Sequence, residues 1–287
     1  MGGDGGGVRP AVTLGRSEVL DLLARHQLRP RRALGQNFVA DANTVRRVAR
    51  LAGIGPGDRV IEVGAGLGSL TLALVETGAE VTAVEVDAGL VSVLRSVAEP
   101  AGVRVVEADA MRLDWATVLG SESWVLVANL PYNVATPLVA RLLDEVPAIT
   151  RMVVMVQREV GERLAAAVGD PAYGAVSVKV GYWATAAVLG RVPPTVFVPR
   201  PKVESVLVSI ERRSLPAVDP GVVAPERLFA LVRAGFGQRR KMLRRSLAGL
   251  VDAAVFERAG IRPEARAEDL DVAAWGRLAA CSAPSPS

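Results

Sequence analysis

The stretch Val60-Ile61-Glu62-Val63-Gly64-Ala65-Gly66-Leu67-Gly68 decides the fold of this 287-residue chain. A short apolar run of the length of a buried strand leads directly into three glycines at alternate positions. Such a turn lets the backbone pass close to a ligand and open a helix, as in nucleotide-binding folds. The pattern predicts the first strand of a Rossmann-like sheet with a ligand at its end, although a tight structural turn would share it.

Further Val-rich runs follow this strand at regular spacing. Segments of helix length separate them, an alternation typical of βαβ units and a parallel sheet. Two later apolar runs, 176–184 and 203–210, leave no room for a helix after each and are expected to add antiparallel strands at one edge. The prediction is an α/β fold with a mostly parallel seven-stranded sheet, whose first five strands are 59–63, 81–85, 103–107, 124–128 and 152–157.

The carboxyl-terminal part of the chain changes character after a segment that contains three prolines. Beyond it, residues 227–250 and 251–280 are expected to form helices, which gives a smaller C-terminal α-helical domain. The predicted organisation is a flexible leader, an α/β domain, a linker, a helical domain and a tail, with bounds 1–16, 17–213, 214–226, 227–280 and 281–287.

Composition excludes several classes of protein. Half of the residues are hydrophobic, enough to bury one or two cores. No apolar run approaches the ~18 residues of a membrane span, and the Gly-rich start lacks the apolar segment of a signal peptide. The only cysteine, Cys281, cannot form an internal disulfide, and the only histidine, His26, leaves Ser-His-Asp and His-metal schemes incomplete. We expect a cytoplasmic protein with no membrane partner and no metal.

Charge is unevenly distributed along the chain. Residues 51–190 carry 9 basic and 16 acidic side chains, a net charge of −7, whereas residues 191–250 carry 12 basic and 4 acidic ones, a net charge of +8. Residues 1–50 are also basic, with 9 basic and 4 acidic side chains. This pattern fits a protein that holds a small cationic or neutral ligand centrally and a polyanion at its sides, and it fits ordinary solvated surface equally well.

The glycine loop and two later carboxylates indicate which ligand is held. A dinucleotide fingerprint needs glycine where this chain has Ser69, so the loop, with Glu62 ahead of it, suits S-adenosylmethionine, which has no pyrophosphate. Glu85 comes 21 residues after Gly64, where an acid accepts both ribose hydroxyls. Asp109 ends the third strand, where its carboxylate could accept the adenine amino group while Ala110 offers its backbone N–H.

The tetrapeptide Asn129-Leu130-Pro131-Tyr132 follows the fourth strand and indicates the chemistry. The exocyclic amine of a nucleobase is a poor nucleophile because its lone pair is delocalised into the ring. The side-chain oxygen of Asn129 and the carbonyl of Leu130 or Pro131 can each accept one amine hydrogen, which frees that lone pair, and Tyr132 offers a face for stacking. No general base is required, since the amine becomes acidic only after methylation. A strand-ending turn with a packed tyrosine would have the same sequence.

In combination these motifs closely resemble the KsgA family of small-subunit ribosomal RNA adenine dimethyltransferases. The resemblance covers nearly the whole chain and includes the segments 34–38, 157–160, 196–205 and 236–243. It implies a class I methyltransferase fold and an RNA-binding helical domain. It also implies transfer of two methyl groups from S-adenosylmethionine to N6 of each of two adjacent adenosines near the 3′ end of 16S rRNA, within immature small ribosomal subunits. We expect the chain to act as a monomer.

The resemblance also implies roles for single residues. The glycine loop would hold the cofactor through Gly64 and Gly66, and Asn129 would contact both the cofactor and the target amine. The family often has histidine at the position of Asn37. The remaining cofactor contacts implied are Asn37 and Val39 at the methionine end, Glu85 at the ribose, and Asp109 with Ala110 at the adenine.

Two further features of the sequence indicate contacts with RNA. Phe197 lies between Pro194 and Pro199 in an expected loop, where its ring is poorly placed for a core and well placed to cover the other face of an extruded base. Within the helix expected over 227–250, a group of cations should project together from one face and contact phosphates. These cations are Arg239, Arg240, Lys241, Arg244 and Arg245.

Three alternatives remain. A large-subunit rRNA adenine methyltransferase of the antibiotic-resistance type shares the glycine loop and the Asn-Leu-Pro-Tyr chemistry, but the Gln-Arg-Arg-Lys segment at 238–241 and the helical domain argue against it. A non-catalytic ribosome assembly factor could keep the fold to bind RNA, although the amine-binding positions are intact. A DNA amino-methyltransferase is the weakest of the three.

Overall fold

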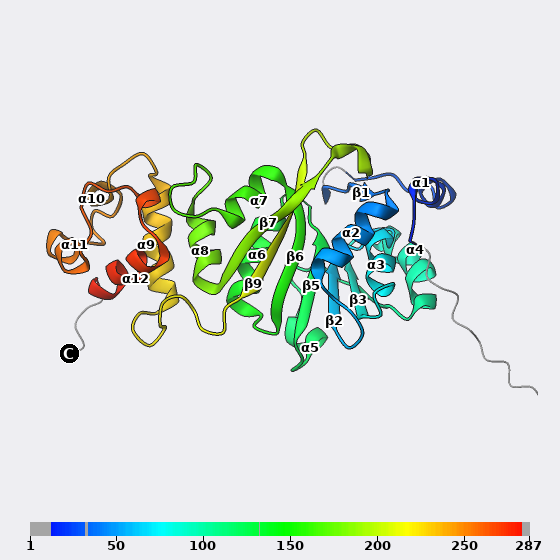
Figure 1. Cartoon of the computed structure of the whole chain (residues 1–287), viewed down its shortest axis with the longest axis horizontal. Helices are drawn as coiled ribbons and strands as arrows, with labels where there is room; N and C mark the ends of the chain where they lie inside the picture. Colours follow the sequence, from blue (N-terminus) through cyan, green and yellow to red (C-terminus); the bar gives the residue numbers. More distant parts are fainter. Residues whose placement is uncertain (1–12, 32–33, 132, 283–287) are drawn as a thin grey trace, which may run out of the picture. The chain divides into compact units, whose positions relative to one another are not determined.

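The computed structural model describes residues 13–31, 34–131 and 133–282 (Figure 1). The chain divides into two compact units, residues 1–161 with 188–209 and residues 162–187 with 210–287. Within the described ranges no helix is long and apolar enough to cross a membrane, and no group of three or more His, Cys, Asp or Glu side chains could hold a metal ion.

The first unit is built on a seven-stranded sheet with the order β4-β3-β2-β5-β6-β9-β7. The pairs β2–β3, β2–β5, β3–β4 and β5–β6 are parallel. A separate antiparallel pair, β1 with β8, aligns Phe38 with Val198 and Val39 with Phe197. The strands are β1 (Phe38–Val39), β2 (Arg59–Val63), β3 (Glu80–Glu85), β4 (Arg104–Glu107), β5 (Trp124–Asn129), β6 (Ile149–Gln157), β7 (Ala184–Val192), β8 (Phe197–Val198) and β9 (Ser205–Arg212).

Helices connect these strands and cover the sheet. Within α2, Val45, Val48 and Ala52 are buried at helical spacing, Asp41 accepts a hydrogen bond from the Thr44 amide at 2.6 Å, and Gly53 ends the helix in a left-handed conformation. α2 contacts both α3 and β6. The elements up to η3 are α1 (Arg16–Arg25), α2 (Ala42–Ala52), α3 (Ser69–Val75), α4 (Ala88–Ala98), η2 (Glu99–Ala101), α5 (Trp115–Leu119), α6 (Ala135–Glu145), α7 (Arg158–Ala165) and η3 (Pro194–Val196).

The second unit contains most of the remaining helices. Its core includes Tyr182, Leu228, Phe256 and Trp275, all 2% exposed or less. Its elements include α8 (Ala175–Trp183), α9 (Pro225–Gly237), α10 (Leu243–Ser246), α11 (Ala253–Ala259), η4 (Ala267–Asp269) and α12 (Val272–Cys281).

The mostly parallel seven-stranded sheet is confirmed, and β2 has the predicted bounds 59–63. The strand expected over 176–184 is wrong, because this segment is the helix α8. Val178 and Tyr182 are one helical turn apart and both are buried in the core of the second unit. A short apolar run fits a buried strand or a buried helix, and here the packing of these two side chains selects the helix.

The single helix expected over 227–250 is also wrong, because α9 ends at Gly237 and α10 begins at Leu243. The chain leaves the helix to pair with a later segment: Met242 bridges to Arg266, and the Leu243 amide donates to the Ala265 carbonyl at 2.7 Å. The helix expected over 251–280 is likewise interrupted between α11 and α12. In the division into two compact units, α8 belongs to the second unit, and the predicted domain bounds stay a prediction.

Candidate cofactor and amine-binding site

A cavity opens in the first unit at the carboxyl ends of β2, β3 and β5. This is the edge at which parallel α/β sheets bind ligands. Every predicted catalytic or cofactor residue that the structure describes lines the cavity. These residues are Asn37, Val39, Gly64, Gly66, Glu85, Asp109, Ala110, Asn129, Leu130, Pro131 and Phe197. Tyr132, the remaining member of the predicted site, lies outside the described residues.

The glycine loop has the backbone that its sequence predicts. Gly64, Gly66 and Gly68 have φ angles of +73°, +59° and +90°, which side chains rarely adopt. A Cβ at Gly66 would lie 3.0 Å from the Phe38 ring. The Gly66 amide donates to Oε2 of Glu85 at 2.8 Å, so the loop and the end of β3 are joined directly.

Glu85 is the centre of the polar part of the cavity. It is 5% exposed, and its Oε1 accepts from the amides of Val86 and Asp87, each at 2.9 Å. Burial raises the pKa of the Glu85 carboxyl, while the backbone donors of Asp87, Gly66 and Val86 oppose that rise. A carboxylate fixed by main-chain donors in this way can accept the two hydroxyls of a ribose at the cavity wall.

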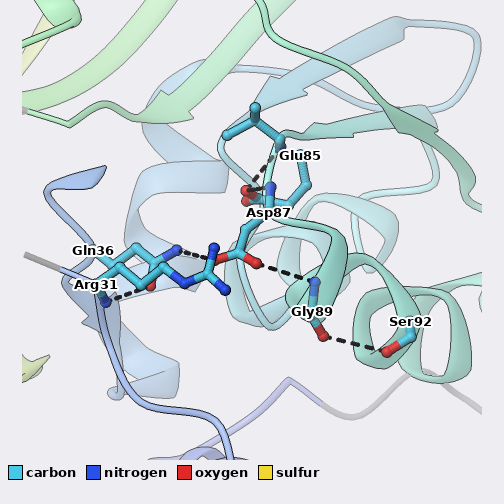
Figure 2. A network of polar contacts seen from close by, with 7 residues as sticks. Arg31, Gln36, Glu85, Asp87, Gly89 and Ser92 are labelled. Carbon is cyan, nitrogen blue, oxygen red and sulfur yellow. Dashed lines mark hydrogen bonds and ion pairs between the residues drawn. The ribbon is translucent and has the colours of Figure 1, made fainter. Parts of the chain in front are cut away.

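A network missed by the sequence analysis ties the segment before β1 to this turn (Figure 2). The Gln36 side chain donates to Oδ2 of Asp87 at 2.9 Å and accepts from the Arg31 amide at 2.8 Å. The Arg31 guanidinium lies 3.5 Å from the same carboxylate. Asp87 also caps α4 by accepting from the Gly89 amide at 3.0 Å. The sequence offered one signal for this role of Asp87: an aspartate directly before an expected helix, where aspartate is a preferred cap.

Glu62 lies beneath the loop and is 2% exposed. Its Oε2 accepts a hydrogen bond from the Thr71 hydroxyl at 2.5 Å. Burial raises the pKa of the Glu62 carboxyl to about 8, the Thr71 bond lowers it, and the nearby Glu85 raises it further. Glu62 is therefore mostly a neutral acid at pH 7.

Asp109 and Ala110 follow β4 at the opposite wall. Oδ1 of Asp109 accepts from the Met111 amide at 2.8 Å, and Oδ2 lies 3.8 Å from the Arg112 guanidinium. The Asp109 side chain is 45% exposed, whereas Ala110 is buried. This half-open carboxylate keeps accepting capacity for an amino group in the cavity.

The turn after β5 separates the two carbonyls that were candidates for the amine. The Pro131 carbonyl accepts from the amides of Val134 and Ala135, at 3.1 and 3.0 Å, where α6 begins. No such bond to the Leu130 carbonyl exists among the described residues. Nδ2 of Asn129 donates to the Asn37 carbonyl at 3.0 Å, which leaves Oδ1 as the acceptor of this side chain. The geometry thus pairs Asn129 Oδ1 with the Leu130 carbonyl.

Phe197 corrects an expectation. The ring is 1% exposed, belongs to the hydrophobic core of the first unit and is held in β8, paired with Val39. The expectation that it is poorly placed for a core is wrong, because β1 and β8 form a short ladder that the isolated two-residue segments do not reveal. Phe197 also lines the cavity, so its contact with a base stays a prediction.

The predicted cation group belongs to the second unit but does not share one helix face. Arg239 is ion-paired with Glu268 at 2.8 Å and donates to the Pro171 carbonyl at 2.9 Å. Arg244 lies 3.5 Å from Glu264. The other three members, Arg240, Lys241 and Arg245, are exposed and make no ion pair within the described part of the chain. The expected unmixed cationic helix face is therefore wrong.

One buried atom tests whether the cavity fits the expected cofactor. The Ser69 hydroxyl lines the cavity, its residue is 6% exposed, and it has no hydrogen-bond partner among the described residues. A buried hydroxyl without a hydrogen-bond partner destabilises the folded protein, and a polar ligand that bonds to it removes this destabilisation. The Ser69 hydroxyl, the carboxyl groups of Glu85 and Asp109, and the side-chain-free backbone at Gly64 all line the cavity. This set of groups fits a nucleoside that carries an amino acid.

Comparison with known proteins places the chain. The profile of the family described as "Ribosomal RNA adenine dimethylase" matches residues 27–283. The chain belongs to this family. A protein of Nocardia farcinica named "Ribosomal RNA small subunit methyltransferase A" is 48% identical over 281 residues, covering 94% of this chain and 96% of its own. A protein of the same name in Cutibacterium acnes is 50% identical over 265 residues, covering 88% of each chain.

Two solved structures resemble the dimethylase fold seen here. The 23S rRNA methyltransferase ErmE has a TM-score of 0.67 at 25% identity, covering 84% of this chain and 98% of its own. A dimethyladenosine transferase from Plasmodium falciparum has a TM-score of 0.70 at 24% identity, covering 82% and 94%. The class I methyltransferase fold is shared by enzymes with different rRNA targets, so the fold of a family member does not by itself select the target.

Proposed function

We propose that this chain dimethylates N6 of two adjacent adenosines near the 3′ end of 16S rRNA, using S-adenosylmethionine, in immature small ribosomal subunits. Membership of the dimethylase family supports adenine dimethylation of ribosomal RNA. The names of relatives that are 48 and 50% identical over most of their length support the choice of the small subunit. In this proposal the enzyme works as a monomer in the cytoplasm. The observation that carries the chemistry is the fixed amide of Asn129 at the cavity wall.

The chain supplies a complete set of contacts for the cofactor. Glu85 accepts the ribose hydroxyls, and Asp109 with the Ala110 amide receives the adenine. Asn37 and Val39 line the methionine end, and Ser69 adds a hydroxyl donor. Bound there, S-adenosylmethionine supplies an electrophilic methyl group on a sulfonium.

The turn after β5 prepares the nucleophile. Asn129 Oδ1 and the Leu130 carbonyl each accept one hydrogen of the adenosine N6 amine, which favours a pyramidal nitrogen with its lone pair directed outward. Since Nδ2 of Asn129 is already held by Asn37, the amide does not rotate when the base arrives. These contacts strengthen as the nitrogen becomes positive, so they act mainly on the transition state.

Proton removal needs no dedicated base in this scheme. The amine becomes strongly acidic only once the methyl group is attached, and the proton can then pass to solvent. Glu62 is a poor base here because it is buried against Thr71 and already largely protonated at neutral pH. The carboxylates of Glu85 and Asp109 serve the cofactor.

The likeness to ErmE favours one competing function, methylation of large-subunit rRNA. A decisive experiment incubates the enzyme and labelled cofactor with small and large subunits from cells that lack it, and then maps labelled adenosines by mass spectrometry. We expect dimethyladenosine at two adjacent positions of 16S rRNA, and far less of it after the same incubation time with Asn129→Ala. Label in 23S rRNA alone would establish the competing function, and absence of label in both would indicate a non-catalytic assembly factor.

A further inference from the structure

Helix α2 carries a pair of arginines on its outer face. Arg47 and Arg50 are three residues apart, so they lie on the same side of the helix, away from the buried Val45, Val48 and Ala52. Arg50 is exposed, and its side chain makes no hydrogen bond or ion pair in the described structure. Neither arginine takes part in the cofactor cavity described above.

Hydrogen bonds connect α2 to two further elements that carry arginines. Nη1 of Arg47 donates to the Arg191 carbonyl at 3.0 Å, which joins the helix to β7. Nη2 of Arg151, on β6, donates to the carbonyl of Gly53 at 3.2 Å, at the end of α2. From Arg47 to Gly53 the helix axis rises about 9 Å. We call Arg47, Arg50, Arg151 and Arg191 the α2 arginine row.

Positive charge in the α2 arginine row is not balanced by the protein. None of its four members forms an ion pair within the described residues, whereas the adjacent Arg46 is paired with Glu76 at 2.7 Å. The nearby Asp58 carboxylate accepts from the Gly55 amide at 2.8 Å. A guanidinium has five donors, and the two hydrogen bonds to the Arg191 and Gly53 carbonyls use one donor each on Arg47 and Arg151. Most donors of the row therefore remain available to a ligand.

We propose that the α2 arginine row binds the sugar-phosphate backbone of ribosomal RNA, as a second RNA surface separate from Arg240, Lys241 and Arg245 in the other unit. This inference rests on the proposed function. Arginine forks match phosphate oxygens in bidentate pairs, and repulsion among four unpaired guanidinium groups is relieved when a polyanion binds.

The row lies on the unit that holds the cofactor cavity. Val39 and Phe197 both line the cavity. α2 begins three residues after Val39, and β7 ends five residues before Phe197. The segment 51–190 that supplies most of the sheet carries a net charge of −7 and would repel RNA. The row supplies local attraction for RNA on the unit that must receive the adenosine.

This surface is tested by neutralising Arg50 and Arg191, whose side chains make no hydrogen bond or ion pair within the described residues. Arg50→Gln, Arg191→Gln and the double variant are compared with Arg104→Gln, which removes an exposed arginine on β4 at the other edge of the sheet. Affinity for a transcript of the 3′ end of 16S rRNA and for small subunits from cells lacking the enzyme is measured across salt concentrations. Each single variant should lower the salt slope by about one and the double by about two, with an affinity loss on the order of tenfold for the double.

The outcomes separate this inference from the proposed function. Cofactor affinity and the rate at saturating subunits should stay at wild-type values in the double variant. Equal slopes for the double variant and Arg104→Gln would overturn the inference even if the wild type dimethylates 16S rRNA. Weaker binding of subunits without weaker binding of the transcript would also overturn it, by assigning the row to a ribosomal protein. If the variants of the α2 arginine row lowered the salt slope but the wild type methylated no 16S rRNA, the RNA-binding role of the row would be supported and the proposed function refuted.

Discussion

The side-chain nitrogen of Asn129 donates to the main-chain oxygen of Asn37 at 3.0 Å, across 92 residues of sequence. The bond connects the end of β5 to the segment before β1, and the Asn37 side chain is itself held by the Gly35 carbonyl at 3.0 Å. Asn129 therefore uses its donor within the protein and keeps its acceptor for the ligand. The amine-binding turn is oriented by a segment that does not belong to the sheet.

Replacement of Asn129 by alanine should affect the rate much more than the affinity. The variant loses the Oδ1 acceptor that strengthens toward the transition state, so the single-turnover rate on small subunits should fall on the order of a hundredfold or more. Affinity for S-adenosylhomocysteine, measured by calorimetry, should fall by less than about tenfold. Equal losses in rate and affinity would show that Asn129 acts only in binding.

Replacement of Ser69 by alanine should change stability and cofactor affinity in opposite directions. The hydroxyl is buried without a partner among the described residues, so its removal should stabilise the cofactor-free protein by about 1 kcal/mol in urea unfolding. If the hydroxyl donates to the cofactor, the same change should weaken S-adenosylhomocysteine binding about fivefold. A stabilised variant with unchanged affinity would remove Ser69 from the cofactor site.

The buried acid Glu62 should make stability depend on pH. Its pKa is about 8 in the folded protein and 4.5 in the unfolded reference, so the folded state holds a proton that the unfolded state releases between these values. The stability it contributes is full below about pH 4.5 and is lost as the pH rises toward 8. Between pH 6 and pH 8 the wild type should lose about 2 kcal/mol from this group.

Glu62→Gln is the matched variant, since it keeps an acceptor for Thr71 and cannot ionise. Its unfolding free energy, measured in urea at pH 6 and pH 8, should vary less than that of the wild type, by roughly the same 2 kcal/mol. A pH dependence identical in both proteins would mean that Glu62 is charged in the folded state.

The sequence was sufficient for the parts of the site that lie at strand ends. Glu85 and Asn129 each close a Val-rich strand, and the carboxyl ends of parallel strands meet at one edge, so their convergence follows from periodicity alone. The sequence could not show which of the two carbonyls is left without an internal donor, because that depends on how the Val134 and Ala135 amides bond to Pro131 at the start of α6.

Long-range packing explains what the sequence did not reveal. Val178 and Tyr182 form a helix because both are buried in the second unit, and Phe197 is buried because β8 pairs with β1. The Gln36–Asp87 bond joins segments 51 residues apart, and no local pattern marks it. Local propensity was overridden in each case by a partner distant in sequence.

Each exposed cation of the second unit should contribute to RNA binding to an extent that depends on whether it already forms an ion pair. Arg240 has no acidic partner in the described structure, so Arg240→Gln should lower the salt slope of small-subunit binding by about one. Arg239 is already neutralised by Glu268 and holds the Pro171 carbonyl, so Arg239→Gln should change the slope less and lower the melting temperature more. Arg233→Gln, which replaces an exposed arginine on α9, is the control for loss of charge alone.

If Arg240→Gln reduced methyl transfer to free adenosine as much as to subunits, the role of Arg240 would be in the catalytic site and not in RNA binding. Equal slopes for Arg239→Gln and Arg240→Gln would show that the Glu268 ion pair opens when RNA binds.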